Sequence, residues 1–319
     1  MEVKSVLSIQ SHVVHGYVGN RAAVFPLQLR GWDVDVINTV SLSNNTGYGS
    51  WTGTKASAQE LSDLYQGLKD RGFAYDALLT GYTWSAEAVR AIGDIASDLK
   101  KRYPHLLWVL DPVLGDGGSL YVSPDVIPAY KELLKSGNAS VITPNGFEVE
   151  TLTGVKLDSL DSIKKALEVF HQEYKIPFVV ISSVELPGSS NLVAVGSAMN
   201  SEPFYIEFPH IEGYFTGTGD IFSAVLLDRF HKHSAASPSS SSASQDQGSW
   251  FERALHDTLA VVFSVLLRTK TLAGVPNDRS SLERAELMKK LELRVIQSQD
   301  LILQDSPSIE QVDFVTKRF

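Results

Sequence analysis

The 319-residue sequence contains no cysteine, so neither disulfide bonds nor thiolate metal sites can form. It also lacks an excess of positive charge, because 28 Lys and Arg residues stand against 37 Asp and Glu residues and give a formal net charge of −9. An acidic chain is a poor partner for nucleic acid or for an anionic membrane surface. The charge does not exclude an anionic substrate, since a locally positive site or a metal ion can hold one.

Long hydrophobic runs are missing as well. No window reaches the roughly 18 apolar residues that a membrane span needs. The opening segment "MEVKSVLSIQ" lacks the basic region, the long apolar stretch and the cleavage site of a signal peptide. These absences predict a cytoplasmic protein with no membrane partner. The 43% of hydrophobic residues in a chain of this length suffice for a full core.

Short β-branched runs alternate with amphipathic helical patterns along most of the chain, and turn residues separate them. The expected strands are 5–9, 34–40, 75–82, 106–113, 140–145 and 178–183, and the expected helices are 19–30, 57–70, 85–102, 124–135 and 159–173. Such alternation predicts parallel βαβ units with helices on both faces of one sheet. The apolar runs 191–198 and 203–211 follow each other without a helix, which predicts an antiparallel pair.

Two segments interrupt this pattern. Residues 41–53, "SLSNNTGYGSWTG", are polar and follow a predicted strand, at the sheet edge where α/β proteins gather ligands. Residues 234–249 are Ser-rich and of low complexity, which predicts a disordered surface loop between two helices because the segment has almost nothing to bury.

The stretch "YFTGTGD", residues 214–220, stands directly before a long apolar run that predicts a helix beginning near residue 219. Gly217 and Gly219 let the backbone approach a ligand, and the free N–H groups of a helix start can bind a phosphoryl group. Asp220 is then either a helix cap and dipole partner or the base that removes a proton from a substrate hydroxyl. The second interpretation describes a phosphotransferase without a P-loop.

A second motif, "TPNGFEVE" at 143–150, places Asn145 and Glu148 three residues apart at the start of a predicted helix. This spacing is typical of a capping box, but it also suits a Mg²⁺ site, because a hard cation prefers oxygen ligands and bridges nucleotide phosphates. Asp111 and Asp116 follow another predicted strand. Carboxylates at several strand ends, together with the glycines of 217–219, are more than capping requires.

Other patterns in the sequence give weaker evidence of a functional site. "GYGSWTGTK" at 47–55 has the wrong spacing for a P-loop, and neither 15–20 nor 115–120 matches the dinucleotide-binding fingerprint. His12 and His15 have no further metal ligand nearby, which favours packing or loop roles over a metal site.

The motifs "SIQSHVVHGYVGN", "SNNTGY", "LLTGY", "DPVLGD", "ITPNGFEVE" and "YFTGTGD" together resemble the pyridoxal kinases of the ribokinase superfamily. The similarity runs from residue 6 to about residue 230, and "LRVIQSQ" at 293–299 resembles the C-terminal strand region of the family. It implies a ribokinase-like three-layer α/β/α sandwich with a mostly parallel central sheet, formed by residues 1–319 as a single kinase domain in which 41–53 is a small lid.

The resemblance also implies ATP-dependent phosphorylation of the 5′-hydroxymethyl group of pyridoxal, pyridoxine or pyridoxamine in vitamin B6 salvage, by a homodimer. The positions that match the family motifs carry the following implied roles: Ser11 and Thr46 contact the pyridine ring, with Tyr82 beside it; Asp111, Asn145 and Glu148 serve ATP and Mg²⁺ or another divalent cation; Asp116 and Thr143 help to bind a monovalent cation, K⁺ or Na⁺; Ser182 and Ser183 touch the nucleotide; Thr216, Gly217, Thr218 and Gly219 hold the phosphates; Asp220 is the catalytic base and contacts the substrate.

The chain departs from the common family pattern at three positions within the matching motifs. Asn45 stands where the lid commonly has His, Gly146 where Gln is usual, and Ser182 where Thr is usual. Two alternatives stay open on the sequence: another ribokinase-like kinase, acting for example on hydroxymethylpyrimidine or a sugar, and a binding protein of the same fold without catalysis.

Overall fold

The computed structural model describes residues 3–236, 243–274, 284–309, 312 and 314–319. Ten strands form one sheet in the order β12-β11-β10-β9-β8-β5-β4-β1-β2-β3. These strands are β1 (Lys4–Val13), β2 (Trp32–Leu42), β3 (Gly53–Lys55), β4 (Ala77–Thr80), β5 (Leu107–Leu110), β8 (Val141–Ile142), β9 (Phe178–Glu185), β10 (Asn191–Ala198), β11 (Phe204–Pro209) and β12 (Val315–Arg318). A separate hairpin joins β6 (Gly115–Asp116) to β7 (Ser119–Leu120).

The centre of the sheet is parallel, from β2 through β1, β4, β5 and β8 to β9. Both margins are antiparallel, with β3 on β2 at one side and β10, β11 and β12 following β9 at the other. The predicted antiparallel pair of 191–198 and 203–211 is therefore confirmed.

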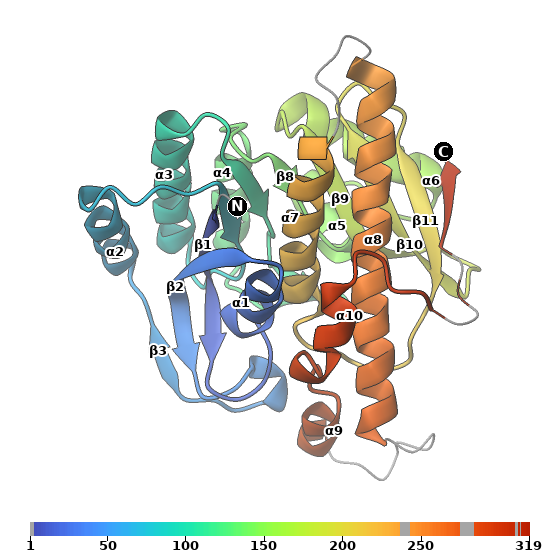
Figure 1. Ribbon diagram of the computed structural model, residues 1–319, viewed down its shortest axis with the longest axis horizontal. Coiled ribbons are helices and arrows are strands. Elements are labelled where there is room, and N and C mark those ends of the chain that lie inside the picture. The colour runs from blue at the N-terminus through green and yellow to red at the C-terminus, as the bar shows by residue number, and fades with distance from the viewer. Residues whose placement is uncertain (1–2, 237–242, 275–283, 310–311, 313) are drawn as a thin grey trace.

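Helices cover both faces because successive strand residues point to opposite sides. In β4, Leu78 packs with one buried cluster, while Ala77 and Leu79 pack with the other. The first cluster includes side chains of α2 (Ala58–Asp70), α3 (Ala86–Arg102), α4 (Val126–Leu134), α5 (Gly146–Thr153) and α6 (Leu160–Glu168). The second includes side chains of α1 (Asn20–Leu29), α7 (Thr218–Ala236), α8 (Ala243–Ala273) and α10 (Gln299–Leu303). The expected three-layer α/β/α sandwich is confirmed, with α7 and α8 standing in front of the sheet in Figure 1.

The remaining elements are short: η1 (Thr46–Tyr48), η2 (Val169–Glu173), α9 (Arg284–Lys290) and η3 (Ile296–Ser298). Two sequence expectations need correction here. Residues 293–299 contain η3 and the first residue of α10 and form no strand, and the last strand of the described chain is β12. The predicted Ser-rich loop of 234–249 has different bounds, because α7 extends to Ala236 and α8 begins at Ala243; residues 237–242 lie outside the described part of the chain. Among the described residues, no helix is long and apolar enough to cross a membrane.

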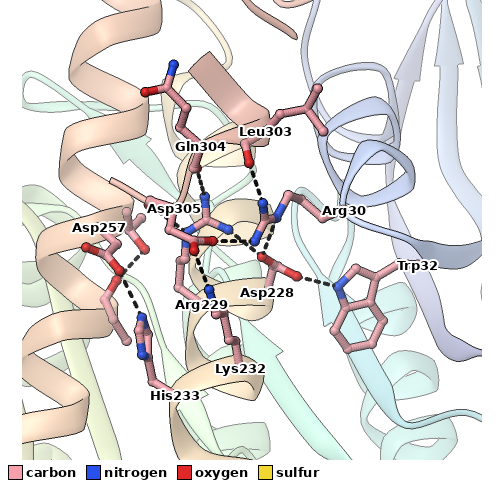
Figure 2. A network of polar contacts seen from close by, with 12 residues as sticks. Arg30, Trp32, Asp228, Arg229, Lys232, His233, Asp257, Leu303, Gln304 and Asp305 are labelled. Carbon is pink, nitrogen blue, oxygen red and sulfur yellow. Dashed lines mark hydrogen bonds and ion pairs between the residues drawn. The ribbon is translucent and has the colours of Figure 1, made fainter. Parts of the chain in front are cut away.

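A buried polar network holds α7 against residues 303–305 and against Arg30, which follows α1 (Figure 2). Asp228 and Arg229 pair at 2.5 Å, and both side chains are almost fully buried. Arg229 also donates to the carbonyl oxygens of Gln304 and Asp305, at 2.6 and 3.1 Å. Asp228 accepts from Arg30 as well. Because every buried charge has partners, the network fixes α7 without leaving an isolated charge in the core.

Candidate active site

The carboxyl ends of adjacent parallel strands meet at one edge of the sheet and supply most of the predicted site residues. Asp111 follows β5, and its N–H donates to the Thr80 carbonyl oxygen at 2.9 Å. Thr143 follows β8, and its N–H donates to the Leu110 carbonyl oxygen at 3.0 Å. Ser182, near the end of β9, donates through its N–H to the Pro144 carbonyl oxygen at 3.0 Å. The ladder therefore brings residues from distant parts of the chain to one edge.

Helix α7 begins at this edge. Gly217 has φ +89°, and a Cβ there would collide with the Tyr17 carbonyl oxygen, so only glycine fits the turn that leads into the helix. The Thr216 hydroxyl oxygen is buried and has no hydrogen-bond partner within the described residues. An orphaned hydroxyl beside the free N–H groups of a helix start is suited to a phosphate oxygen.

The first turn of α7 lies beside Asp111. A Cβ on Gly219 would be 3.6 Å from Asp111 Oδ2. One turn further, the Ser223 hydroxyl donates to Asp111 Oδ2 at 3.0 Å and lies 3.2 Å from the Thr143 hydroxyl. The predicted start near residue 219 agrees with the observed first residue, Thr218.

Burial raises the pKa of three carboxyl groups at this place, those of Asp111, Glu148 and Asp220. Burial raises the pKa of Asp111, and the neighbouring Asp220 raises it further. Burial also raises the pKa of Glu148, and Asp111 adds to that effect. Burial raises the pKa of Asp220 to about 6, while the Gly19 N–H that donates to its carboxylate opposes the shift. Asp220 keeps partial access to solvent, whereas Asp111 and Glu148 are 5% and 3% exposed.

The capping interpretation of Asn145 and Glu148 is confirmed. Asn145 Oδ1 accepts from the Glu148 N–H, and Glu148 Oε2 accepts from the Asn145 N–H, both at 2.9 Å, at the start of α5. Glu148 Oε1 accepts from the Leu114 N–H at 3.0 Å, and Asn145 Nδ2 donates to the Gly115 carbonyl oxygen at 2.9 Å. The cap thus also fixes the loop that follows Asp111.

The chemistry of these acids fits a divalent cation. No Lys, Arg or His forms an ion pair with Asp111, Glu148 or Asp220 in the part of the chain that the structure describes. A hard cation with its waters would stabilise the ionised forms, which burial disfavours in all three acids and which repulsion also disfavours in Asp111 and Glu148. The protein alone is not a complete cage, because the described residues contain no group of three or more His, Cys, Asp or Glu side chains arranged to hold a metal ion.

The residues predicted to lie at the substrate ring, Ser11, Thr46 and Tyr82, differ in solvent exposure. Ser11 is buried beside Gly19, whose backbone approaches the Ser11 hydroxyl so closely that a Cβ at 19 would collide with it. Tyr82 is half-buried, and burial raises its pKa. Thr46 is exposed in η1. Ser11 therefore contacts Gly19, whose backbone N–H faces Asp220. No contact among the described residues joins Thr46 directly to Asp220.

Two predicted pairs are not joined by hydrogen bonds in the described structure. Asp116 is exposed on β6 and accepts from the Gly117 N–H, while Thr143 is buried against Ser223. Ser182 and Ser183 are half-buried, and the Ser182 hydroxyl makes only a 3.5 Å contact with the Pro144 carbonyl oxygen.

Sequence reasoning missed Gly19 and Ser223. Ser223 stands three residues after Asp220, on the same side of the helix, and this spacing is a signal that could have found it. Gly19 lies within a quoted motif, but its contact with Asp220 joins segments far apart in the chain.

Comparison with known proteins adds to this geometry. The family model described as phosphomethylpyrimidine kinase matches residues 34–261. The pyridoxal kinase of Homo sapiens is 42% identical over 244 residues, which cover 72% of this chain and 78% of the human protein. The chain belongs to the pyridoxal kinase family.

Solved structures of this family share the fold. The pyridoxal kinase from Leishmania donovani in complex with ADP and pyridoxamine is 33% identical, with a TM-score of 0.84 and 99% of each chain covered. The pyridoxal kinase from Trypanosoma brucei is also 33% identical, with a TM-score of 0.78 over 99% of this chain and all of that one, 100%. The ribokinase-like fold class is thereby confirmed.

Proposed function

We propose that this protein is an ATP-dependent pyridoxal kinase that phosphorylates the 5′-hydroxymethyl group of pyridoxal, and also of pyridoxine and pyridoxamine, in vitamin B6 salvage. The observation that carries the proposal is the position of Asp220 in the first turn of α7, next to Asp111 and behind the glycine turn at Gly217. A base and an anion-binding helix start on the same turn are what phosphoryl transfer to an alcohol requires.

In the proposed reaction, the Asp220 carboxylate accepts the proton of the substrate hydroxyl as its oxygen attacks the γ-phosphorus of ATP. The bond between that phosphorus and the β,γ-bridging oxygen breaks, and ADP leaves with its electron pair. Backbone N–H groups of residues 217–219 and the orphaned Thr216 hydroxyl hold phosphate oxygens. Positioning and charge neutralisation do most of the work in such transfers.

Cations complete the proposed site. Asp111 and Glu148 would hold Mg²⁺ or another divalent cation, directly or through water, and such an ion supplies charge neutralisation for the phosphates. The exposed Asp116 and the buried Thr143 would contribute to a site for K⁺ or Na⁺, which the family resemblance supports. Ser182, Ser183 and Asn145 would lie along the nucleotide, and Ser11, Thr46 and Tyr82 along the vitamer.

The proposal extends to the organisation of the chain. Residues 1–319 would form a single kinase domain in which 41–53 closes as a lid over the substrate, and two chains would form a cytoplasmic homodimer. The lid assignment draws support from the place of 41–53 between β2 and β3, at the edge where the site lies.

The match to the phosphomethylpyrimidine kinase model keeps one alternative substrate in view, hydroxymethylpyrimidine. A panel of pyridoxal, pyridoxine, pyridoxamine and hydroxymethylpyrimidine, each with ATP and Mg²⁺ and followed by ADP release, separates the two. We expect kcat/KM to be highest for a B6 vitamer. A preference for the pyrimidine would replace the proposed substrate, and no turnover with any of the four would support a binding protein without catalysis.

A further inference from the structure

Glu292 is a buried acid separate from the three carboxylates of the proposed transfer site. Its side chain belongs to a residue that is 6% exposed, and it forms no ion pair within the described residues. Buried charges of this kind are costly unless hydrogen bonds compensate them. We therefore expect this carboxylate to hold the groups that surround it in place.

Three donors converge on this carboxylate from two separate segments. Oε1 accepts from Asn45 Nδ2 at 3.2 Å and from the Tyr48 hydroxyl at 3.0 Å. Oε2 accepts from the Tyr17 N–H at 3.2 Å. Because both oxygens face donors, a neutral amide at 292 would have to turn its own NH₂ group toward at least one of them.

The backbone of residue 16 lies directly against the same carboxylate. Gly16 has φ +94°, and a Cβ there would be 2.7 Å from each Glu292 oxygen. On the other side, Met288 packs over the backbone of Gly47, whose Cβ would be 2.6 Å from Met288 Cε. The segment from 288 to 292 therefore contacts both the 16–17 loop and η1.

The 16–19 loop, which contacts Glu292, also lies beside the proposed catalytic base Asp220. Two residues beyond Tyr17, the backbone N–H of Gly19 faces the Asp220 carboxylate and favours its ionised form, which lowers the pKa of Asp220. The Tyr17 carbonyl oxygen closely approaches Gly217, and Leu293, the neighbour of Glu292, also packs there, with Leu293 Cδ1 3.4 Å from the position of a Gly217 Cβ. Displacing the loop from Glu292 would move the donor that faces Asp220.

We propose that Glu292 is a positioning residue for acceptor phosphorylation. It fixes η1, which carries Thr46, and the 16–19 loop, which carries the donor to Asp220, in one relative arrangement. Asn45 then acts as a donor from the proposed lid to this carboxylate, which gives a physical role to one of the three positions where this chain departs from the common family residue. This inference rests on the proposed kinase function.

The test compares Glu292→Gln with the wild type in steady-state assays with pyridoxal and ATP. Hydrogen bonds to a charged group are the strong ones, so we expect the KM for pyridoxal to rise roughly 10- to 100-fold while the KM for ATP stays within about threefold. Tyr48→Phe, which removes one donor and keeps the ring, should raise the pyridoxal KM by roughly 3- to 10-fold. In the double variant the two effects should be less than additive, since both remove the same contact.

Glu252→Gln is the matched control, because Glu252 on α8 pairs with Arg318 on β12 and lies outside the proposed site. It should leave both KM values unchanged. A pyridoxal KM within about threefold of the wild type in both Glu292→Gln and Tyr48→Phe would overturn the inference, as would an equal rise for ATP and pyridoxal. If Glu292→Gln does not fold, Tyr48→Phe alone decides the matter. A wild type inactive on pyridoxal would instead count against the proposed function itself.

Discussion

Asn145 and Glu148 exchange hydrogen bonds, each accepting from the backbone N–H of the other at 2.9 Å. The same Glu148 carboxylate lies close enough to Asp111 for their charges to raise the pKa of Glu148. A helix cap and a proposed cation ligand are therefore one side chain, and the two roles can be separated by substitution.

Glu148→Gln should keep the cap, because a Gln side-chain oxygen can replace the acceptor of a capping box. The Mg²⁺ concentration for half-maximal rate should rise at least about tenfold, because one negative ligand is lost. Glu148→Ala should show the same change and also lose about 1 kcal/mol of unfolding free energy. Rates over a Mg²⁺ series and urea unfolding measure the two effects. An unaltered Mg²⁺ requirement in both variants would leave Glu148 a cap only.

The acid limb of the pH profile reports on Asp220. Burial raises the pKa of its carboxyl group to about 6, and the base must be ionised to accept a proton. At saturating Mg²⁺, kcat/KM should therefore rise with pH up to about 6 and level off above it. The Asp220→Asn variant, whose side chain does not titrate, should lack this limb in whatever residual rate remains. A wild-type profile that is flat between pH 5 and 7 would contradict the assignment.

The buried pair of Asp228 and Arg229 should matter for stability. Arg229→Met leaves Asp228 without its nearest cation and should lower the unfolding free energy by about 3–5 kcal/mol. Lys232→Met is the control, because Lys232 pairs with Asp305 at an exposed site where such pairs contribute about 0–1 kcal/mol. Urea denaturation followed by circular dichroism measures both. Equal losses for the two variants would show that burial of the pair is unimportant.

The proposed lid, residues 41–53, should exchange its amide hydrogens faster in the empty protein than with pyridoxal and an unreactive ATP analogue bound. The reason is that a closed loop keeps water from the activated phosphate. Amides in the middle of α3 should exchange slowly in both states and serve as the internal control. Equal protection of 41–53 in both states would make the segment a fixed wall.

The sheet could be predicted because its strands carry local signals. The buried runs in β1, β4 and β5 alternate with helices of clear periodicity, and adjacent apolar runs announced the β10–β11 pair. The secondary structure of the C-terminal region was harder to predict from the sequence. The apolar residues of 293–299 suit a strand as well as the turn and η3 that the chain forms there.

The candidate site was predictable where function sits in short motifs and hidden where it depends on distant contacts. Asp220 and Gly217 stand within one turn, so local spacing indicated an anion site. Glu292 and Asn45 are 247 positions apart, and no local pattern links them. Sequence also left Glu148 between cap and metal ligand, because both roles need a carboxylate at the same spacing.

The most direct test of the central claim measures phosphate transfer to pyridoxal by the wild type and by Asp220→Asn. Product is identified by mass and by phosphorus NMR, with Asp94→Asn, an exposed position on α3, as the control. The wild type and the control should form pyridoxal 5′-phosphate and ADP in equal amounts. Asp220→Asn should bind pyridoxal with a KM within about threefold of the wild type but lose about 10²- to 10⁴-fold in kcat. A wild type that forms no pyridoxal 5′-phosphate, or an Asp220→Asn variant with kcat within about threefold of the wild type, would contradict the account.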